Sequence, residues 1–261
     1  MAPNKTLVFK KVPQGLPVAG EHLAIEDRPL DLDAAPPAGH LLIKVLEASL
    51  DPYLRGKMRD PSIKSYSLPF EVNAPITNRS VGRIIASAAD GFAVGDLVWA
   101  FTPIAEYALI KAEESVKKIS NPHGLDLGHF LGALGMPGIT AFSSFYKIGQ
   151  PKKGETIFVS SAAGAVGQVV GQLAKLEGLT VIGSVGSDEK LDFIVKDLGF
   201  DAGFNYKKEK PLDALQRLAP DGIDIYFENV GGEHLDAALL SLKRFGRVIV
   251  CGLVSSCFDA G

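Results

Sequence analysis

The second half of the chain alternates between short apolar segments and segments whose apolar residues recur at helical spacing. The short segments predict strands at residues 156–160, 180–184, around Phe204, 223–227 and 247–251. The helical stripes between them are Val166, Val169, Val170 and Leu173, then Leu191, Ile194, Val195 and Leu198, then Leu235, Ala238, Leu239 and Leu242. This alternation is typical of a doubly wound parallel sheet, because parallel strands need helical crossovers that cover both faces. We expect Ser187 to cap the second helix and Gly246 to end the last one.

The first 120 residues show a different pattern, of short strands between turn signals. Strands are predicted at residues 40–49, 81–86, 97–100 and 106–110, which favours a small barrel or sandwich. A chain of 261 residues is near the length at which one core divides into two. We therefore predict a β-rich domain over residues 1–125 and an α/β domain over residues 126–261.

Composition narrows the class of partner. Hydrophobic residues make up 46% of the chain and charged residues 22%, which is typical of a packed globular protein. The net charge is −3, from 27 Lys and Arg against 30 Asp and Glu, and no long run of one sign occurs. This balance argues against nucleic acid as a partner and favours a small molecule.

Several features bear on the compartment. The start, MAPNKTLVFKK, lacks the apolar region of a secretory signal. The uncharged stretches 127–146 and 156–174 are rich in Gly, Ala, Ser and Thr, so we expect buried structure there and no membrane span. Cys251 and Cys257 provide no disulfide framework. A cytoplasmic location is the resulting expectation.

A loop of small residues follows the first strand of the α/β half and leads directly into a helix. It comprises Ala162, Ala163, Gly164, Ala165, Val166 and Gly167. A dinucleotide-binding fold places its Gly-rich turn here, where backbone N–H groups and the helix N-terminus meet a pyrophosphate. Gly164 would allow the close approach and Gly167 the close packing of helix and strand, while Ala162 stands where the first Gly usually lies. Tight packing without a ligand is the alternative reading of such a cluster.

The end of the second strand bears on which dinucleotide is bound. Proteins that prefer NAD usually carry Asp or Glu about 20 residues past the first glycine position. Here that position falls on Ile182, Gly183 and Ser184, with Lys190 just beyond. The absence of a carboxylate and the presence of an ammonium group favour NADP, although Lys190 could also be an ordinary solvated lysine.

Asn229 follows the predicted strand at 223–227 and precedes two glycines. Open α/β sheets bind ligands at the carboxyl ends of their strands, so this amide could reach a ribose or a carboxamide. The alternative is a turn residue without a binding role.

Two other kinds of chemistry find no support in the sequence. The five histidines and two cysteines show no metal-ligand spacing, so we predict that no zinc is bound. No G-x-S-x-G motif is present, so serine-based hydrolysis is not expected.

Motifs spread along the chain resemble those of one family. They are residues 51–56 (DPYLRG), 135–141 (GMPGITA), the loop 162–167, 227–232 (FENVGG) and 250–252 (VCG). With them the sequence, over nearly its whole length, resembles the zinc-independent medium-chain dehydrogenase/reductases. Within that superfamily it is similar to the NADPH-dependent alkenal double-bond reductases and the leukotriene B4 12-hydroxydehydrogenase/prostaglandin reductases.

The resemblance implies a GroES-like substrate domain, a Rossmann domain that binds NADPH, and hydride transfer to the β-carbon of an α,β-unsaturated aldehyde or ketone. Residues 51–53 stand where zinc-dependent relatives carry their first cysteine ligand. The implied cofactor contacts are Lys190 and Tyr206 at the 2′-phosphate, Gly186 on the adenosine side, Asn229 and Cys251 on the ribose and nicotinamide side, and Pro52. Tyr53 would contact the substrate and is the one side chain we name as a proton donor. An aromatic residue that only packs is the alternative for Tyr53.

Differences from the family pattern add expectations. Family members run longer, so the resemblance implies a Rossmann domain that lacks its last strand. The exposed edge at residues 247–251 would favour association, such as a homodimer. Cys257 stands where members commonly carry a tyrosine that helps to place the substrate. Two alternatives to an active enone reductase stay open: a weakly active or inactive NADP-binding product, and a quinone reductase.

Overall fold

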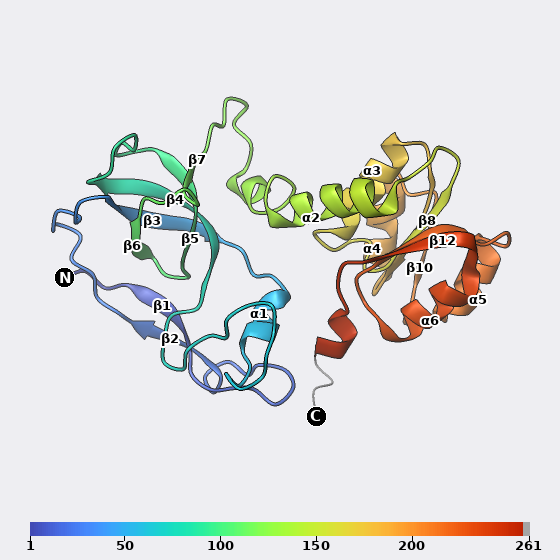
Figure 1. Cartoon of the computed structure of the whole chain (residues 1–261), viewed down its shortest axis with the longest axis horizontal. Coiled ribbons are helices and arrows are strands. Elements are labelled where there is room, and N and C mark those ends of the chain that lie inside the picture. Colours follow the sequence, from blue (N-terminus) through green and yellow to red (C-terminus); the bar gives the residue numbers. More distant parts are fainter. Residues whose placement is uncertain (258–261) are drawn as a thin grey trace. The chain divides into compact units, whose positions relative to one another are not determined.

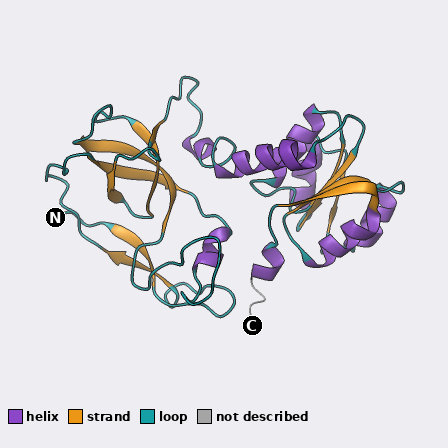
Figure 2. Cartoon of the chain, viewed as in Figure 1, coloured by secondary structure: helices purple, strands orange, loops and turns teal. Residues whose placement is uncertain are grey.

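The computed structural model describes residues 1–257 and divides into two compact units (Figure 1). The first unit is Met1–Leu131 and the second begins at Gly132. Figure 2 shows that strands and loops dominate the first unit, whereas helices surround the sheet of the second.

The first unit is built on an antiparallel sheet with the strand order β6-β3-β4-β5-β7. Its strands are β3 (His40–Ala48), β4 (Thr77–Ser87), β5 (Leu97–Pro103), β6 (Tyr107–Lys111) and β7 (Lys117–Lys118). A separate antiparallel pair joins β1 (Lys5–Phe9) to β2 (Leu23–Asp27). The helices are α1 (Tyr53–Lys57) and the 3-10 turn η1 (Leu127–Phe130). The four predicted strands correspond to β3, β4, β5 and β6, while β1, β2 and β7 were not predicted.

The second unit contains a parallel sheet with the order β10-β9-β8-β11-β12. Its strands are β8 (Thr156–Val159), β9 (Thr180–Val185), β10 (Ala202–Asn205), β11 (Ile223–Glu228) and β12 (Leu242–Val250). The chain builds outward from β8 through β9 to β10, then returns to place β11 on the other side of β8. The predicted doubly wound sheet is confirmed, and its order reverses beside β8.

Helices cover both faces of this sheet. They are α2 (Met136–Ser144) with the π-turn η2 (Phe145–Gly149), α3 (Gly167–Leu176), α4 (Asp188–Asp192) with the π-turn η3 (Phe193–Asp197), α5 (Pro211–Leu218), α6 (Gly232–Ser241) and the 3-10 turn η4 (Val254–Cys257). Residues of α2, α3 and η3 pack on one face, and residues of α5 and α6 pack on the other.

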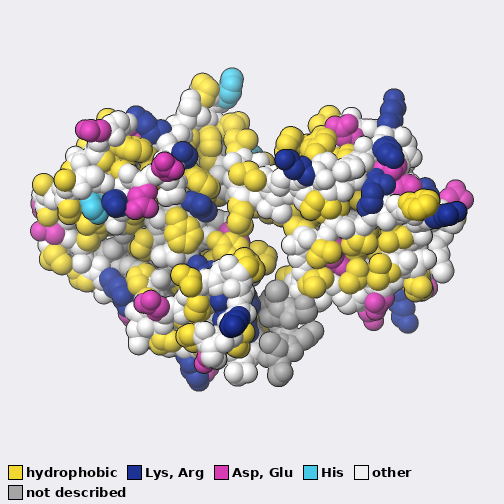
Figure 3. Space-filling model, viewed as in Figure 1, with side chains coloured by type: hydrophobic (Ala, Val, Ile, Leu, Met, Phe, Trp, Pro, Cys, Tyr) yellow, Lys and Arg dark blue, Asp and Glu magenta, His cyan; other side chains and the backbone are white. Residues whose placement is uncertain are grey.

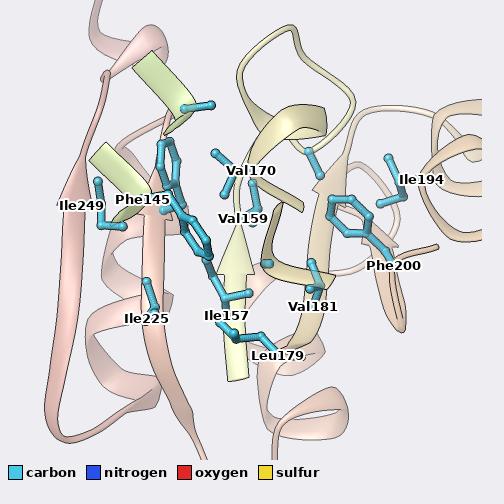
Figure 4. Packing of buried hydrophobic residues seen from close by; sticks show 14 of the residues in the cluster. Phe145, Ile157, Val159, Val170, Leu179, Val181, Ile194, Phe200, Ile225 and Ile249 are labelled. Atoms are coloured by element: carbon cyan, nitrogen blue, oxygen red, sulfur yellow. The ribbon is translucent and has the colours of Figure 1, made fainter. Parts of the chain in front are cut away.

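Alternating side chains of the strands supply the two cores. Ile157 and Val159 face α2 and α3, whereas Phe158 between them faces α5 and α6. Figure 4 shows the first of these cores, in which Phe145 and Val170 lie against the strand residues. Each fully buried side chain of this kind contributes roughly 1.5–3 kcal/mol relative to an exposed one. These cores fix the carboxyl ends of the strands and the loops that follow them.

One predicted boundary is wrong. Gly246 was expected to end the last helix, but α6 ends at Ser241 and Gly246 lies inside β12. Leu242 already pairs with Ile223 of β11, so strand pairing ends the helix earlier. An irregularity in the pairing follows, and there Phe245 takes the left-handed backbone conformation, with φ 64°.

The distribution of surface charge and the lengths of the helices bear on two expectations, that the partner is not nucleic acid and that no segment spans a membrane. Figure 3 shows basic and acidic side chains mixed over the face in view. Within residues 1–257, no helix is long and apolar enough to cross a membrane.

Candidate functional site

A cavity of about 680 Å³ lies at the carboxyl ends of the parallel strands of the second unit. This volume is within the usual range for small-molecule sites. Its lining comes from the segments after β8, β9, β10 and β11, together with α6 and η4. The lining residues are Ser161, Ala163, Gly164, Val185, Gly186, Ser187, Lys190, Tyr206, Lys207, Val230, Gly231, Gly232, Glu233, His234, Val254 and Ser255. The cavity therefore lies at the point where the strand order reverses, which is where open α/β sheets bind ligands.

The loop between β8 and α3 has little room for side chains. A Cβ at Gly167 would lie 2.4 Å from the carbonyl oxygen of Ser161, and a Cβ at Gly164 would lie 3.0 Å from the same atom. Ser161 itself has φ 51°, a conformation that costs free energy in a residue other than glycine. The close contact at Gly167 bears out its predicted packing role and brings the start of α3 close to the end of β8.

Ala162 stands where a first glycine was expected, and the neighbouring strand accommodates its methyl group. Ala162 is fully buried, and its N–H donates to the carbonyl oxygen of Ser184 at 3.0 Å. A Cβ at Gly183 on β9 would lie 2.7 Å from the Cβ of Ala162. The missing side chain at Gly183 thus leaves the space that Ala162 occupies.

The structure brings several of the predicted site residues to the cavity. Those that line it are Ala163, Gly164, Gly186, Lys190 and Tyr206. A Cβ at Gly186 would lie 2.9 Å from the hydroxyl oxygen of Tyr206, so the absence of a side chain there leaves room for the tyrosine. The other predicted residues of this unit, Ala162, Ala165, Val166, Gly167, Asn229 and Cys251, are not part of the lining.

Asn229 and Cys251 lie where the strand ends are joined. The Nδ2 atom of Asn229 donates to the carbonyl oxygen of Ser160 at 2.8 Å, which ties the end of β11 to the end of β8. The N–H of Cys251 donates to the carbonyl oxygen of Glu228 at 3.0 Å. Burial raises the pKa of the Cys251 thiol, with a smaller effect from Glu228, so the thiol is held in its protonated form. The side chain of Cys257 lies outside the described residues.

Glu228 organises the loop that follows β11, and sequence reasoning did not single it out. Its side chain is fully buried, and Oε1 accepts hydrogen bonds from the N–H groups of Val230 at 2.5 Å and Gly231 at 2.8 Å. These bonds fix the backbone that forms one wall of the cavity. The residue's position at the end of an apolar strand was the available signal.

Two lysines lie at the cavity. Lys190 at the start of α4 and Lys207 after β10 both line it, and neither forms an ion pair with any described residue. The nearby Asp188 is engaged with Asn205 and Lys208. Ser187 caps α4 as predicted, since its Oγ accepts from the N–H of Lys190 at 3.3 Å. Lys207 was not predicted, although it directly follows Tyr206.

The ring of His234, at the start of α6, packs against the ring of Tyr206. Its ring is stacked against those of Phe158 and Phe204, and the Tyr206 ring meets it edge-on with a centroid distance of 5.2 Å. The imidazole is buried, and Nε2 has no hydrogen-bond partner among the described residues. Burial lowers the pKa of His234 below 6.5, despite the opposing effect of Glu228 and Glu233. The ring is therefore neutral near pH 7.

Pro52 and Tyr53 belong to the first unit. Pro52 immediately precedes α1, and Tyr53 is its first residue. The Tyr53 ring is half-buried and packs against a core that contains Phe9 and Phe70, and its hydroxyl donates to Oδ1 of Asn78. Burial is the main reason why the pKa of Tyr53 is raised above 10.

The part of the chain that the structure describes does not fit a zinc site. Among the side chains that the structure describes, no group of three or more from His, Cys, Asp or Glu is arranged to hold a metal ion. These residues therefore lack the set of side-chain ligands that a bound zinc ion requires.

Comparison with known proteins agrees with this architecture. A family model described as the N-terminal domain of oxidoreductase matches residues 5–119, and one described as zinc-binding dehydrogenase matches residues 165–259. The NADP-dependent oxidoreductase RED1 of Cochliobolus heterostrophus is 52% identical over 257 residues, covering 98% of this chain and 73% of that protein. A 2-alkenal reductase (NADP(+)-dependent) of Nicotiana tabacum is 44% identical over 253 residues, covering 97% and 73%.

Solved structures give the same result. The crystal structure of CurA in complex with NADPH from Vibrio vulnificus matches with a TM-score of 0.91 and 36% identity. The match covers 98% of this chain and 74% of CurA. Together with these matches, the fold and the site define a two-domain NADP-dependent oxidoreductase, in which a cavity lies at the carboxyl ends of a parallel sheet. The chain belongs to the medium-chain dehydrogenase/reductases, which confirms the resemblance and the two-part fold inferred from its motifs.

The neutral state of His234 predicts how the free energy of unfolding depends on pH. Because its pKa is lowered in the folded protein, the unfolded chain binds more protons as the pH falls through about 6.5. We expect the free energy of unfolding, measured with urea, to be lower at about pH 5.5 than at about pH 7.5, and we expect His234→Phe to reduce this difference. The exposed His123 serves as a control, since His123→Phe should leave the pH dependence as it is. If wild type and His234→Phe lost equal stability between about pH 7.5 and about pH 5.5, the lowered pKa of His234 would be contradicted.

Proposed function

We propose that this protein reduces the carbon-carbon double bond of α,β-unsaturated aldehydes or ketones with NADPH, without zinc. The observation that carries the cofactor assignment is the cavity at the reversal of strand order, which is lined by the loop before α3 and by Lys190 and Lys207. The names of the similar tobacco and fungal proteins support both the cofactor and the class of reaction.

In this proposal, NADPH would bind in the cavity of the second unit. The pyrophosphate would bind over the loop 162–167, where Gly164 lines the cavity without a side chain and α3 begins with the positive end of its dipole. Lys190, Tyr206 and Lys207, which line the cavity, would bind the 2′-phosphate, and Gly186 would lie on the adenosine side. No carboxylate lies between the end of β9 and Ser187, and the next one, that of Asp188, is engaged with Asn205 and Lys208.

The remaining predicted residues take roles on the nicotinamide and substrate sides. Asn229 and Cys251 are assigned to the ribose and nicotinamide, Pro52 to the cofactor and Tyr53 to the substrate. When bound, NADPH supplies a hydride for the β-carbon of the substrate. The protein must then orient the enone, stabilise charge on the carbonyl oxygen and admit a proton to the α-carbon.

The reaction itself is the first test. With a 2-alkenal as substrate we expect loss of NADPH absorbance and formation of the saturated aldehyde, identified by mass spectrometry. NADPH binding is measured in parallel by fluorescence. Turnover with quinones alone would replace the proposal with a quinone reductase, and binding without any turnover would leave an NADP-binding protein that is not a reductase.

Lys190 provides a test of cofactor choice. Charge-assisted hydrogen bonds to phosphate are worth about 1.5–3 kcal/mol, so Lys190→Ala should weaken NADPH binding by roughly tenfold or more and leave NADH binding unchanged. Lys196→Ala is the matched control, because Lys196 lies in the adjoining turn η3 and pairs with Asp192. Equal losses for NADPH and NADH would show that Lys190 does not recognise the 2′-phosphate.

A further inference from the structure

Asn78 lies fully buried on β4 and makes three hydrogen bonds around Tyr53. Its Nδ2 donates to the carbonyl oxygen of Ser49 at 2.7 Å and to Oδ2 of Asp51 at 2.7 Å, while Oδ1 accepts the hydroxyl of Tyr53. None of the motifs that indicated function included Asn78. The side chain is nevertheless the direct partner of the residue assigned to the substrate.

The chemistry of these partners fixes the direction of every bond. A carbonyl oxygen and a carboxylate oxygen can only accept hydrogen bonds, so the NH₂ group of Asn78 must face Ser49 and Asp51. The amide oxygen must then face Tyr53, and because this oxygen can only accept, the hydroxyl of Tyr53 has to donate. If the amide were flipped, its oxygen would face the oxygens of Ser49 and Asp51, and all three atoms can only accept hydrogen bonds.

We propose that Asn78 is a specificity-determining positioning residue, which engages the Tyr53 proton so that the Tyr53 oxygen accepts a hydrogen bond from the bound ligand. This inference rests on the proposed contact between Tyr53 and the substrate. It implies that the site favours a ligand group that donates a hydrogen bond over a carbonyl group, which only accepts, so that a group other than the Tyr53 hydroxyl polarises the enone carbonyl. It also implies that the proton for the α-carbon comes from a source other than the Tyr53 hydroxyl in this arrangement.

The charged surroundings of Tyr53 are consistent with a retained proton. Burial and the negative charge of Asp51 raise the pKa of Tyr53 and outweigh the opposing effect of Arg79. The guanidinium of Arg79 lies over the ring of Trp99 at 4.1 Å. The hydroxyl therefore stays protonated near neutral pH and remains available to Asn78.

A pair of unreactive ligands with one carbon skeleton tests the proposal, namely a saturated ketone and the corresponding secondary alcohol. Their dissociation constants are measured by calorimetry on the protein loaded with NADP⁺, which requires no turnover. The wild type should bind the alcohol about threefold to tenfold more tightly than the ketone, the range expected for one hydrogen bond. Tyr53→Phe and Asn78→Leu should each abolish this preference, and the double variant should lose nothing more.

Two further variants separate positioning from a structural effect. Ser80→Ala should keep the preference, because Ser80 lies two residues along the same strand and its hydroxyl bonds to Thr102 instead. Asn78→Asp, in its protonated form, keeps an acceptor for Tyr53 and a donor for Asp51, so it should also retain the preference; this variant decides the question if Asn78→Leu does not fold. Thermal unfolding of each variant identifies those that are folded.

The outcomes distinguish the inference from the proposed function. If Tyr53→Phe removes the preference but folded Asn78→Leu retains it, the role of Asn78 is wrong while the substrate contact of Tyr53 stands. If the wild type prefers the ketone, or a folded Asn78→Asp loses the alcohol preference, the inference is overturned. If Tyr53→Phe alters neither constant, both the inference and the proposed substrate contact fail. A clear alcohol preference in a protein that does not reduce 2-alkenals would overturn the reaction and support the role of Asn78.

Discussion

The contact between the start of α3 and the end of β8 is the constraint on which the cavity depends. A side chain at Gly167 would lie 2.4 Å from the Ser161 carbonyl oxygen, so only glycine allows the helix to begin there. Ala162 can occupy the turn because Gly183 on the adjacent strand has no side chain to oppose its methyl group. The positive end of the α3 dipole thereby lies close to the loop whose residues Ala163 and Gly164 line the cavity.

Charge then distinguishes among the ligands that such a cavity could hold. Lys190 and Lys207 line it without forming ion pairs with the described residues, against one acidic lining residue, Glu233, and the end of β9 itself carries no acidic side chain. Neutral His234 packs against Tyr206, and buried Glu228 fixes the backbone of Gly231, which also lines the cavity. The arrangement suits an anionic nucleotide with an additional phosphate, in agreement with the NADP-dependent relatives.

Local patterns in the sequence predicted the parallel sheet, the glycine-containing loop and the residues at the carboxyl end of β9. These features are encoded within short segments, where apolar spacing and small residues are readable directly. The strand β7 was missed because its two lysines are exposed and carry no apolar pattern. Lys207 and His234 reach the cavity only through the packing of β10 and α6, and Asn78 meets Tyr53 across 25 residues of chain. Such long-range pairings leave no periodic signal in the sequence.

Hydrogen exchange measured by mass spectrometry, with and without NADPH, tests the placement of the cofactor most directly. We expect slower exchange on addition of NADPH in peptides that cover residues 161–167, 186–190 and 229–234, with little change at the distant end of the sheet around Gly222. Binding of NADPH that leaves exchange in these three segments unchanged would contradict the proposed cofactor site.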